Sequence, residues 1–328
     1  MALLEVDGLT VDFPLRRGVL RAIDGVSFDI AQGEVLGVVG ESGAGKSLTG
    51  AAIIGLLEPP GRITGGQVRL DGRRIDNLSQ GDMRPIRGKQ IGAIFQDPLT
   101  TLNPLYSIGR QLVETMQTHM RLSDRDARER AVKWLEDVGI PAARQRIGAY
   151  PHEFSGGMRQ RVVIALALCA EPRLVIADEP TTALDVSIQA QIIALLKQVT
   201  RDHGTSVMLV THDMGVIAET VDRVAVMYAG RIAEIGPVRD VIRTPSHPYT
   251  VGLMGSIPSL THRVDRLAQI DGAMPRLNAV PSGCAFNPRC ARVFDRCLVD
   301  RPVLLPAGAT SAACWLYDAA HARAVANV

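Results

Sequence analysis

The sequence has little net charge and no long apolar run, and both absences exclude classes of function. Its 36 lysine and arginine residues barely exceed its 34 aspartate and glutamate residues, which gives a net charge of +2. No strong basic field therefore points to nucleic acid or to an anionic lipid surface as a partner. The longest unbroken apolar stretch, residues 162–170, is about half as long as a membrane-spanning helix requires.

An export signal is also missing, and cysteine is scarce. The first ten residues, MALLEVDGLT, carry acids early and lack a basic region followed by an apolar segment and a small-residue cleavage site. We therefore expect the chain to stay in the cytoplasm. Of the five cysteines, Cys169 lies alone in an apolar run, whereas Cys284, Cys290, Cys297 and Cys314 fall in one C-terminal stretch. In a reducing compartment, clustered thiols indicate a metal before disulfides.

Apolar segments separated by turn residues predict an α/β fold. We expect strands at 35–39, 91–95, 174–177, 207–210, 224–227 and 232–235, and helices over 46–57, 123–138 and 186–202. This alternation predicts a largely parallel, doubly wound sheet. Residues 97–160 are expected to be mainly helical, and the segment after Gly236 is expected to form a separate appendage. No fixed repeat is present, which predicts a single catalytic cassette.

A phosphate-binding loop is predicted between the first strand and the first helix. The segment GESGAGKS matches the pattern G-x(4)-G-K-[ST], whose glycines let backbone amides converge on phosphate oxygens at a helix N-terminus. Lys46 is expected to hold the β- and γ-phosphates, and Ser47 to bind Mg²⁺. The alternative is an ordinary loop that matches by chance. The residues expected to contact the nucleotide here are Gly40, Ser42, Gly43, Gly45, Lys46, Ser47 and Leu48.

Two acidic residues follow the apolar strand at 174–177. Asp178 and Glu179 would lie at the carboxyl edge of a parallel sheet, where ligands bind in such folds. Asp178 is expected to hold Mg²⁺ through water, and Glu179 to polarise the attacking water. Acids are also common at helix N-termini for electrostatic reasons, so the pair indicates catalysis only together with the phosphate loop.

A second anion site is predicted in FSGGMRQR, residues 154–161. Ser155, Gly156 and Gly157 precede an apolar helix and expose several backbone amides. This site is far in sequence from the single phosphate loop. We therefore expect the two sites to serve different nucleotides, one from each side of a dimer.

Taken in order, these motifs resemble the ABC transporter ATPases over about residues 1–240. The resemblance narrows to the dipeptide and oligopeptide permease ATPases through IFQDPLTTLNP, DEPTTALDVSIQAQI, HPYT at 247–250 and the cysteine-bearing tail. It implies an α/β P-loop nucleotide-binding domain with a helical subdomain and a small cysteine-containing C-terminal domain. The implied boundaries are 1–96 and 161–240 for the ATPase core with its N-terminal β-subdomain, 97–160 for the helical signature subdomain, and 241–328 for the C-terminal domain.

The resemblance also implies roles for four further residues. Phe13 would stack on adenine, Gln96 would link Mg²⁺ to the transmembrane interface, and His212 would contact the γ-phosphate. Asp185, in the loop from Ala183, would cross the dimer interface. Each has an alternative: Phe13 as a core aromatic, Gln96 and His212 as capping or core polar groups, and Asp185 as a helix N-cap.

The signature segment departs from the commonest family form at two positions. Phe154 stands in place of leucine and Met158 in place of glutamine. Because Ser155 and both glycines remain, we expect contact with phosphate to survive.

The implied function is that of an ATP-binding and ATP-hydrolysing subunit of a membrane importer for dipeptides or oligopeptides, with ATP and Mg²⁺. The implied partners are a second, non-identical ABC ATPase subunit, two transmembrane permease subunits and an external solute-binding protein, at the cytoplasmic side of the inner membrane. A homodimer stays open, as does a nickel or other small solute. A soluble ABC ATPase acting on DNA or ribosomes would carry duplicated cassettes, zinc-finger insertions or a basic arm, which this sequence lacks. A regulatory module without turnover is a further alternative.

Four thiolates could together hold one metal centre in the tail. The cysteines are separated by five, six and sixteen residues, and the first two spacers are longer than those usual for zinc. A wider [4Fe-4S] cluster bound by Cys284, Cys290, Cys297 and Cys314 therefore fits better. Zinc, and free or disulfide-bonded thiols, are the alternatives. No catalytic acid accompanies the cysteines, which favours a structural or sensing role.

Overall fold

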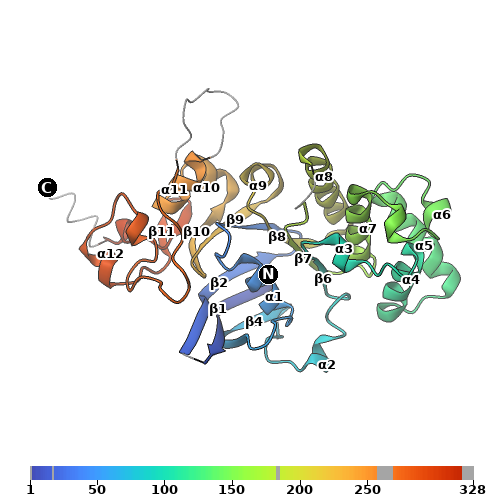
Figure 1. Ribbon diagram of the computed structural model, residues 1–328, viewed down its shortest axis with the longest axis horizontal. Coiled ribbons are helices and arrows are strands. Elements are labelled where there is room, and N and C mark those ends of the chain that lie inside the picture. The colour runs from blue at the N-terminus through green and yellow to red at the C-terminus, as the bar shows by residue number, and fades with distance from the viewer. Residues whose placement is uncertain (1, 17, 182–184, 257–268, 320–328) are drawn as a thin grey trace. The chain divides into compact units, whose positions relative to one another are not determined.

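A computed structural model describes residues 2–16, 18–181, 185–256 and 269–319 (Figure 1). The chain forms two compact units, each assembled from segments that are distant in sequence. The first unit comprises residues 1–4, 30–35 and 70–210, and the second comprises residues 5–29, 36–69 and 211–328. The predicted nucleotide motifs are thus divided between the two units.

The first unit is built on three parallel strands. β6 (Ile91–Ile94) pairs with β7 (Leu174–Asp178), and β7 pairs with β8 (Ser206–Val210). β8 is buried along its whole length and β7 along all but its last residue, as expected for parallel strands covered on both faces. The carboxyl ends of parallel strands meet at one edge, so β6 and β7 bring the residues that follow them close together.

Helices fill the described chain between β6 and β7. They are α3 (Pro98–Thr101), α4 (Ile108–His119), α5 (Asp124–Asp137), α6 (Ala143–Arg146) and α7 (Gly156–Leu168), and α4, α5, α6 and α7 pack together (Figure 1). Ser123 begins α5 as expected, because its hydroxyl accepts the backbone N–H of Asp126 at 3.2 Å. α2 (Gln80–Met83) and the two-residue β5 (Arg73–Arg74) precede β6, and α8 (Val186–His203) ends at Gly204.

The second unit contains the N-terminal strands and the phosphate-loop strand. β1 (Ala2–Leu15) lies between β2 (Gly18–Ala31) and β4 (Arg62–Leu70) in one sheet. In the other sheet, β3 (Val35–Val39) pairs in parallel with β9 (Arg223–Tyr228), and α1 (Lys46–Ile53) follows β3. α1 ends four residues earlier than the sequence predicted.

The prediction of a largely parallel sheet is wrong for the C-terminal strands. β9 is antiparallel to β10 (Arg231–Pro237), β10 to β12 (Thr310–Ala312), and β12 to β11 (Leu305–Ala307). The turn between β9 and β10 is Ala229–Gly230, and both residues have positive φ, 47° and 78°. A two-residue turn of this kind joins only antiparallel strands, so the sheet is mixed.

A separate small C-terminal domain is not supported. β12 adds to the edge of β10, and residues 211–328 belong to the same compact unit as the phosphate loop. The short helices of this region are α9 (Met214–Thr220), α10 (Val238–Arg243), α11 (Pro248–Gly255) and α12 (Asp295–Val299), of which α10 and α11 contact β10 (Figure 1). An uncovered β10 edge would expose unpaired backbone groups, which explains why the tail docks there. In the described ranges no helix is long and apolar enough to cross a membrane.

Candidate nucleotide-binding site

The phosphate loop follows the buried strand β3 and requires glycine at two positions. A Cβ atom at Gly40, whose φ is +150°, would overlap the carbonyl oxygen of Met227 on β9. A Cβ atom at Gly45, whose φ is +103°, would lie 2.6 Å from Cδ1 of Ile23. The loop backbone therefore packs against two neighbouring strands so closely that side chains are excluded.

Lys46 begins α1 and folds back over the loop. Its side chain is 6% exposed, and its ammonium donates to the carbonyl oxygens of Gly40 at 2.9 Å and Glu41 at 3.1 Å. Loop amides at a helix N-terminus together with a cation form a site for a polyanion. Of the other loop residues predicted to contact nucleotide, Ser42, Gly43 and Ser47 are exposed and Leu48 is half-buried.

Two further predicted residues belong to the same unit as the loop. Phe13, on β1, is half-buried, and a Cβ atom at Gly61 would lie 2.6 Å from its ring. The Phe13 ring thus packs closely against the backbone at Gly61. His212 is exposed, and its neighbour Thr211 donates its N–H to the carbonyl of Val38 at 3.2 Å, at the end of β3.

The first unit brings together two predicted residues that are distant in sequence. Nε2 of Gln96, after β6, donates to Oε2 of Glu179, after β7, at 3.1 Å. Glu179 has a φ of +45°, and its N–H donates to the carbonyl of Val210 at 2.8 Å. Asp178, the last residue of β7, is half-buried like Glu179. The arrangement fixes one carboxylate next to an amide at the carboxyl edge of the parallel strands.

The signature segment opens α7 as a capped helix N-terminus. Ser155 is the N-cap, and its hydroxyl accepts the N–H of Met158 at 3.4 Å. A Cβ atom at Gly157 would lie 2.9 Å from Cγ2 of Ile188 on α8, so glycine lets the two helices approach closely. Phe154 is 3% exposed. Phe154 therefore packs in the core, and the Ser155 cap is present beside it.

Asp185 is the N-cap of α8. Its carboxylate accepts the N–H of Ile188 at 3.0 Å, and the side chain is exposed. The capping interpretation is thus confirmed, while the interface role stays a prediction. Ala183 and the residues on either side of it, 182–184, lie outside the described residues.

Sequence reasoning missed the residues that support the phosphate loop from the C-terminal region. The carboxylate of Glu41 forms an ion pair with Arg289 at 3.0 Å, and the backbone N–H of Glu41 donates to the hydroxyl of Tyr249 at 2.9 Å. Tyr249 stands in the HPYT segment, which served in the sequence only as a family marker. No local pattern relates residues that are more than 200 positions apart.

The four tail cysteines line one small cavity. Cys284, Cys290, Cys297 and Cys314 surround a space of about 10 Å³, and all four are free thiols. Burial raises the pKa of Cys284 and of Cys314 to about 11. Among the described residues, no group of three or more His, Cys, Asp or Glu side chains is arranged to hold a metal ion. The structure therefore does not support a metal centre in this conformation. Cys169, buried at the end of α7, lies in the first unit.

Comparison with known proteins relates the whole chain to transport ATPases. A family model described as ABC transporter matches residues 23–182, and one described as oligopeptide/dipeptide transporter, C-terminal region, matches residues 233–297. The dipeptide transport ATP-binding protein DppD of Bacillus subtilis is 47% identical over 98% of this chain and 97% of its own length. The oligopeptide transport ATP-binding protein OppD of Salmonella typhimurium is 48% identical over 90% of this chain and 88% of its own.

Solved structures share the cassette part of the fold. A dimeric, post-hydrolysis structure of the ATP-binding cassette MJ0796, bound to ADP and Pi, superposes with a TM-score of 0.65 at 28% identity. The superposition covers 72% of this chain and 99% of the solved chain. The superposition leaves the other 28% of this chain unmatched.

Proposed function

This chain belongs to the ABC transporter ATPase family, and on that premise we propose that it is the ATP-hydrolysing subunit of an importer of dipeptides or oligopeptides. The observation that carries the proposal is that the similarity extends past the cassette into the C-terminal region, which matches its own oligopeptide/dipeptide transporter model. Relatives that match 90–98% of this chain are named as dipeptide or oligopeptide transport ATP-binding proteins.

In the proposed mechanism, the second unit binds the nucleotide phosphates. Lys46 and the loop amides neutralise the β- and γ-phosphates, and His212 contacts the γ-phosphate. The half-buried ring of Phe13 stacks on adenine. Ser47 would supply an oxygen ligand for Mg²⁺, a hard cation that would neutralise phosphate charge when bound.

The first unit supplies the hydrolytic groups in this proposal. Glu179 orients and polarises the attacking water, and Asp178 would help to hold Mg²⁺. Gln96, hydrogen-bonded to Glu179, ties the carboxylate to the segment that follows β6. Ser155 and its neighbouring glycines would bind the nucleotide held by a partner subunit, and Asp185 would lie at that interface.

The proposed assembly contains two ATPase subunits. The dimeric MJ0796 cassette structures support this arrangement. The second subunit is proposed to be non-identical, and two permease subunits and an external solute-binding protein complete the importer. We place the chain on the cytoplasmic side of the membrane. The domain division proposed for it is a core of 1–96 and 161–240, a signature subdomain of 97–160, and a C-terminal part of 241–328.

The proposal also includes a metal cluster bound by the four tail cysteines. The donor chemistry fits, because four thiols and no carboxylate line one cavity. The space of about 10 Å³ holds no more than about one water, so the cysteine-bearing segments must separate to admit a cluster. Cys284, Cys290, Cys297 and Cys314 would hold a [4Fe-4S] cluster, which would cross-link the tail. Iron and sulfide analysis of anaerobically purified protein, compared with Cys290→Ser, tests this; zinc or no metal contradicts it.

Steady-state hydrolysis tests the main proposal. The wild-type chain should hydrolyse Mg·ATP, and Glu179→Gln should lower kcat by roughly 10²–10⁴-fold while ATP still binds. Glu136→Gln, at an exposed position on α5 outside these motifs, is the matched control and should leave kcat unchanged. An unchanged rate in Glu179→Gln would remove this residue from catalysis. Absence of hydrolysis in the wild type, also with its partner subunits, would leave only a binding or regulatory role.

A further inference from the structure

Glu41, the second residue of the phosphate loop, has every polar group engaged. Its N–H donates to the Tyr249 hydroxyl at 2.9 Å, and its carboxylate accepts from Nη1 of Arg289 at 3.0 and 3.1 Å. Its carbonyl accepts from Nζ of Lys46 and from the N–H of Ala44, both at 3.1 Å. Two of the four partners come from the C-terminal region.

Arg289 is itself held rigidly. Its side chain is 7% exposed, and it donates to the carbonyls of Asp271 at 2.9 Å and Ile270 at 3.3 Å. Nη1 also donates to the Tyr228 hydroxyl at 3.3 Å. The Tyr249 ring is fully buried and packs against Tyr228 with 4.6 Å between the ring centres. Neither Arg289 nor Tyr249 can follow a movement of the phosphate loop without breaking these contacts.

The loop needs such support because its backbone is intrinsically flexible. Gly40, Gly43 and Gly45 all adopt positive φ, which glycine reaches at a cost in conformational entropy. Amides that converge on phosphate must be held close to the productive geometry. Charge matters as well, because an unpaired Glu41 carboxylate beside the loop would repel a polyphosphate.

We propose that Tyr249 and Arg289, the C-terminal clamp, are positioning residues that fix Glu41 and so preorganise the phosphate loop for nucleotide. The inference rests on the proposed ATP-binding function of the loop. Arg289 both holds the Glu41 side chain and cancels its charge. Tyr249 holds the Glu41 backbone. The C-terminal region, which a bare cassette lacks, thereby takes part in nucleotide affinity.

Equilibrium binding of a fluorescent ATP analogue to the full chain tests the clamp. Arg289→Gln should raise Kd about tenfold, because the Glu41 carboxylate loses its charge-assisted partner. Adding Glu41→Gln to that variant should recover part of the affinity, because the uncompensated charge is removed. Tyr249→Phe should raise Kd by a smaller factor. KM for ATP should rise more than kcat falls. The control is Arg296→Gln, which removes another paired C-terminal arginine, one that stacks on Trp315 at 3.6 Å.

Three results would overturn the clamp. The first is a wild-type Kd for the ATP analogue in folded Arg289→Gln. The second is a rise in Kd for Arg296→Gln that equals the rise for Arg289→Gln. The third is a double variant whose change in binding free energy is the sum of the changes for Arg289→Gln and Glu41→Gln alone. If Arg289→Gln fails to fold, a wild-type Kd in Tyr249→Phe overturns the proposal in its place. Failure of the wild type to hydrolyse ATP would count against the proposed function, while these binding comparisons would still decide the clamp.

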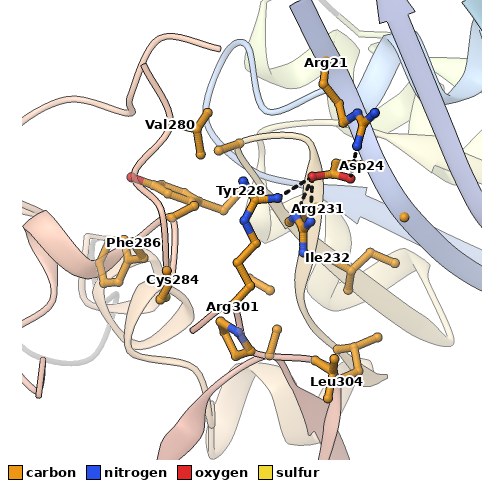
Figure 2. A pocket seen from close by; sticks show the side chains of 18 of the residues that line it. Arg21, Asp24, Tyr228, Arg231, Ile232, Val280, Cys284, Phe286, Arg301 and Leu304 are labelled. Atoms are coloured by element: carbon orange, nitrogen blue, oxygen red, sulfur yellow. Dashed lines mark hydrogen bonds and ion pairs between the residues drawn. The ribbon is translucent and has the colours of Figure 1, made fainter. Parts of the chain in front are cut away.

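A different observation, a cavity of about 670 Å³ in the second unit, carries a second inference (Figure 2). At one side, Arg21, Arg231 and Arg301 point toward the single carboxylate of Asp24, which they contact at 3.5, 2.6 and 2.8 Å. Arg21 also pairs with Asp12 at 3.0 Å. Three guanidinium groups thus face two carboxylates, which leaves one positive charge unmatched in this cluster.

Apolar side chains form much of the remaining wall of the cavity, to which Ser27, Asn278 and Tyr228 add polar groups. Ile232, Val280, Phe286 and Leu304 contribute to its walls (Figure 2), and Val303 lines it while remaining 61% exposed. The volume falls in the range of small-molecule sites, which combine apolar walls with a few convergent polar groups. Exposed apolar side chains next to a guanidinium fork match an anion with an apolar body.

We infer that this cavity binds a small amphipathic carboxylate. A fatty acid and the C-terminal end of an apolar peptide both combine a carboxylate with an apolar body. The probes are therefore octanoate and N-acetyl-Leu-Phe, each compared by calorimetry with its neutral amide. At least one acid should bind with a Kd at least tenfold below that of its amide, and the stronger of the two identifies the source. Arg301→Gln should abolish the difference, whereas Arg243→Gln, at an exposed position on α10, should not. No binding by either acid, or equal binding by Arg301→Gln, overturns the inference.

Discussion

The buried carboxylate of Glu234 anchors the HPYT segment to the sheet, and its neutralisation should destabilise the second unit. Glu234 lies on β10 and is fully buried. Its two oxygens accept the N–H groups of Ser246 and His247, each at 2.9 Å, and the hydroxyl of Thr310 at 3.0 Å. Through these bonds one side chain joins β10, the start of α11 and β12.

The cost of Glu234→Gln follows from these three hydrogen bonds. The amide keeps one oxygen, so its NH₂ group must face a backbone N–H that then has no acceptor. Losing one charge-assisted bond costs ~1.5–3 kcal/mol, and the two remaining bonds weaken by ~0.5–1 kcal/mol each when the charge is removed. A neutral amide is cheaper to bury than a carboxylate, which offsets part of the loss. We expect the free energy of unfolding to fall by about 2–3 kcal/mol.

Urea unfolding followed by tryptophan fluorescence measures this change. Trp134 lies in the first unit and Trp315 in the second, so a Trp134→Phe background makes Trp315 the only reporter. The midpoint should fall in Glu234→Gln while the slope m stays constant. Glu58→Gln, an exposed carboxylate, should not shift it. An unchanged midpoint in Glu234→Gln would refute the argument, because it would mean that the three bonds contribute nothing net.

Further predictions concern pH, the phosphate loop and a helix cap. Burial lowers the pKa of His247 to about 4, so the unfolded chain binds more protons than the folded chain between about pH 6.5 and 4. The free energy of unfolding should therefore fall as pH falls through this window, by about 3 kcal/mol in total. His247→Asn should flatten this pH dependence in unfolding titrations. Gly40→Ala should abolish ATP binding, because the new methyl overlaps the carbonyl of Met227, whereas Gly148→Ala, which meets nothing within 4 Å, should bind normally in the same assay. Ser155→Ala should cost about 1 kcal/mol of stability through the lost N-cap, and an unchanged melting temperature would contradict this.

Local sequence patterns predicted the parts of this protein whose physics is local. A strand, a glycine-rich turn and a helix are specified within a few residues, so the strand before this loop and the helix that begins at Lys46 were predicted correctly. The phosphate-binding role of Lys46 stays a prediction. Helix caps are equally short-range: Asp185 caps its helix as its position suggested, and Ser123 caps α5 at the predicted start of that helix. Membership of the family followed from the order of such motifs, and the comparisons bear it out.

Only the tertiary structure decided which distant residues meet. The contact of Gln96 with Glu179 joins positions 83 residues apart, and it exists because β6 and β7 are parallel neighbours. The ion pair of Glu41 with Arg289 spans 248 residues, and it depends on the C-terminal region docking beside the loop. The same docking turned an expected separate domain into further strands of the second unit's sheet. Hydrophobic periodicity and helix capping depend on residues that are close in sequence, so the sequence predicts them. Covering an open sheet edge and pairing buried charges join residues that are distant in sequence, so only the tertiary structure shows which residues meet.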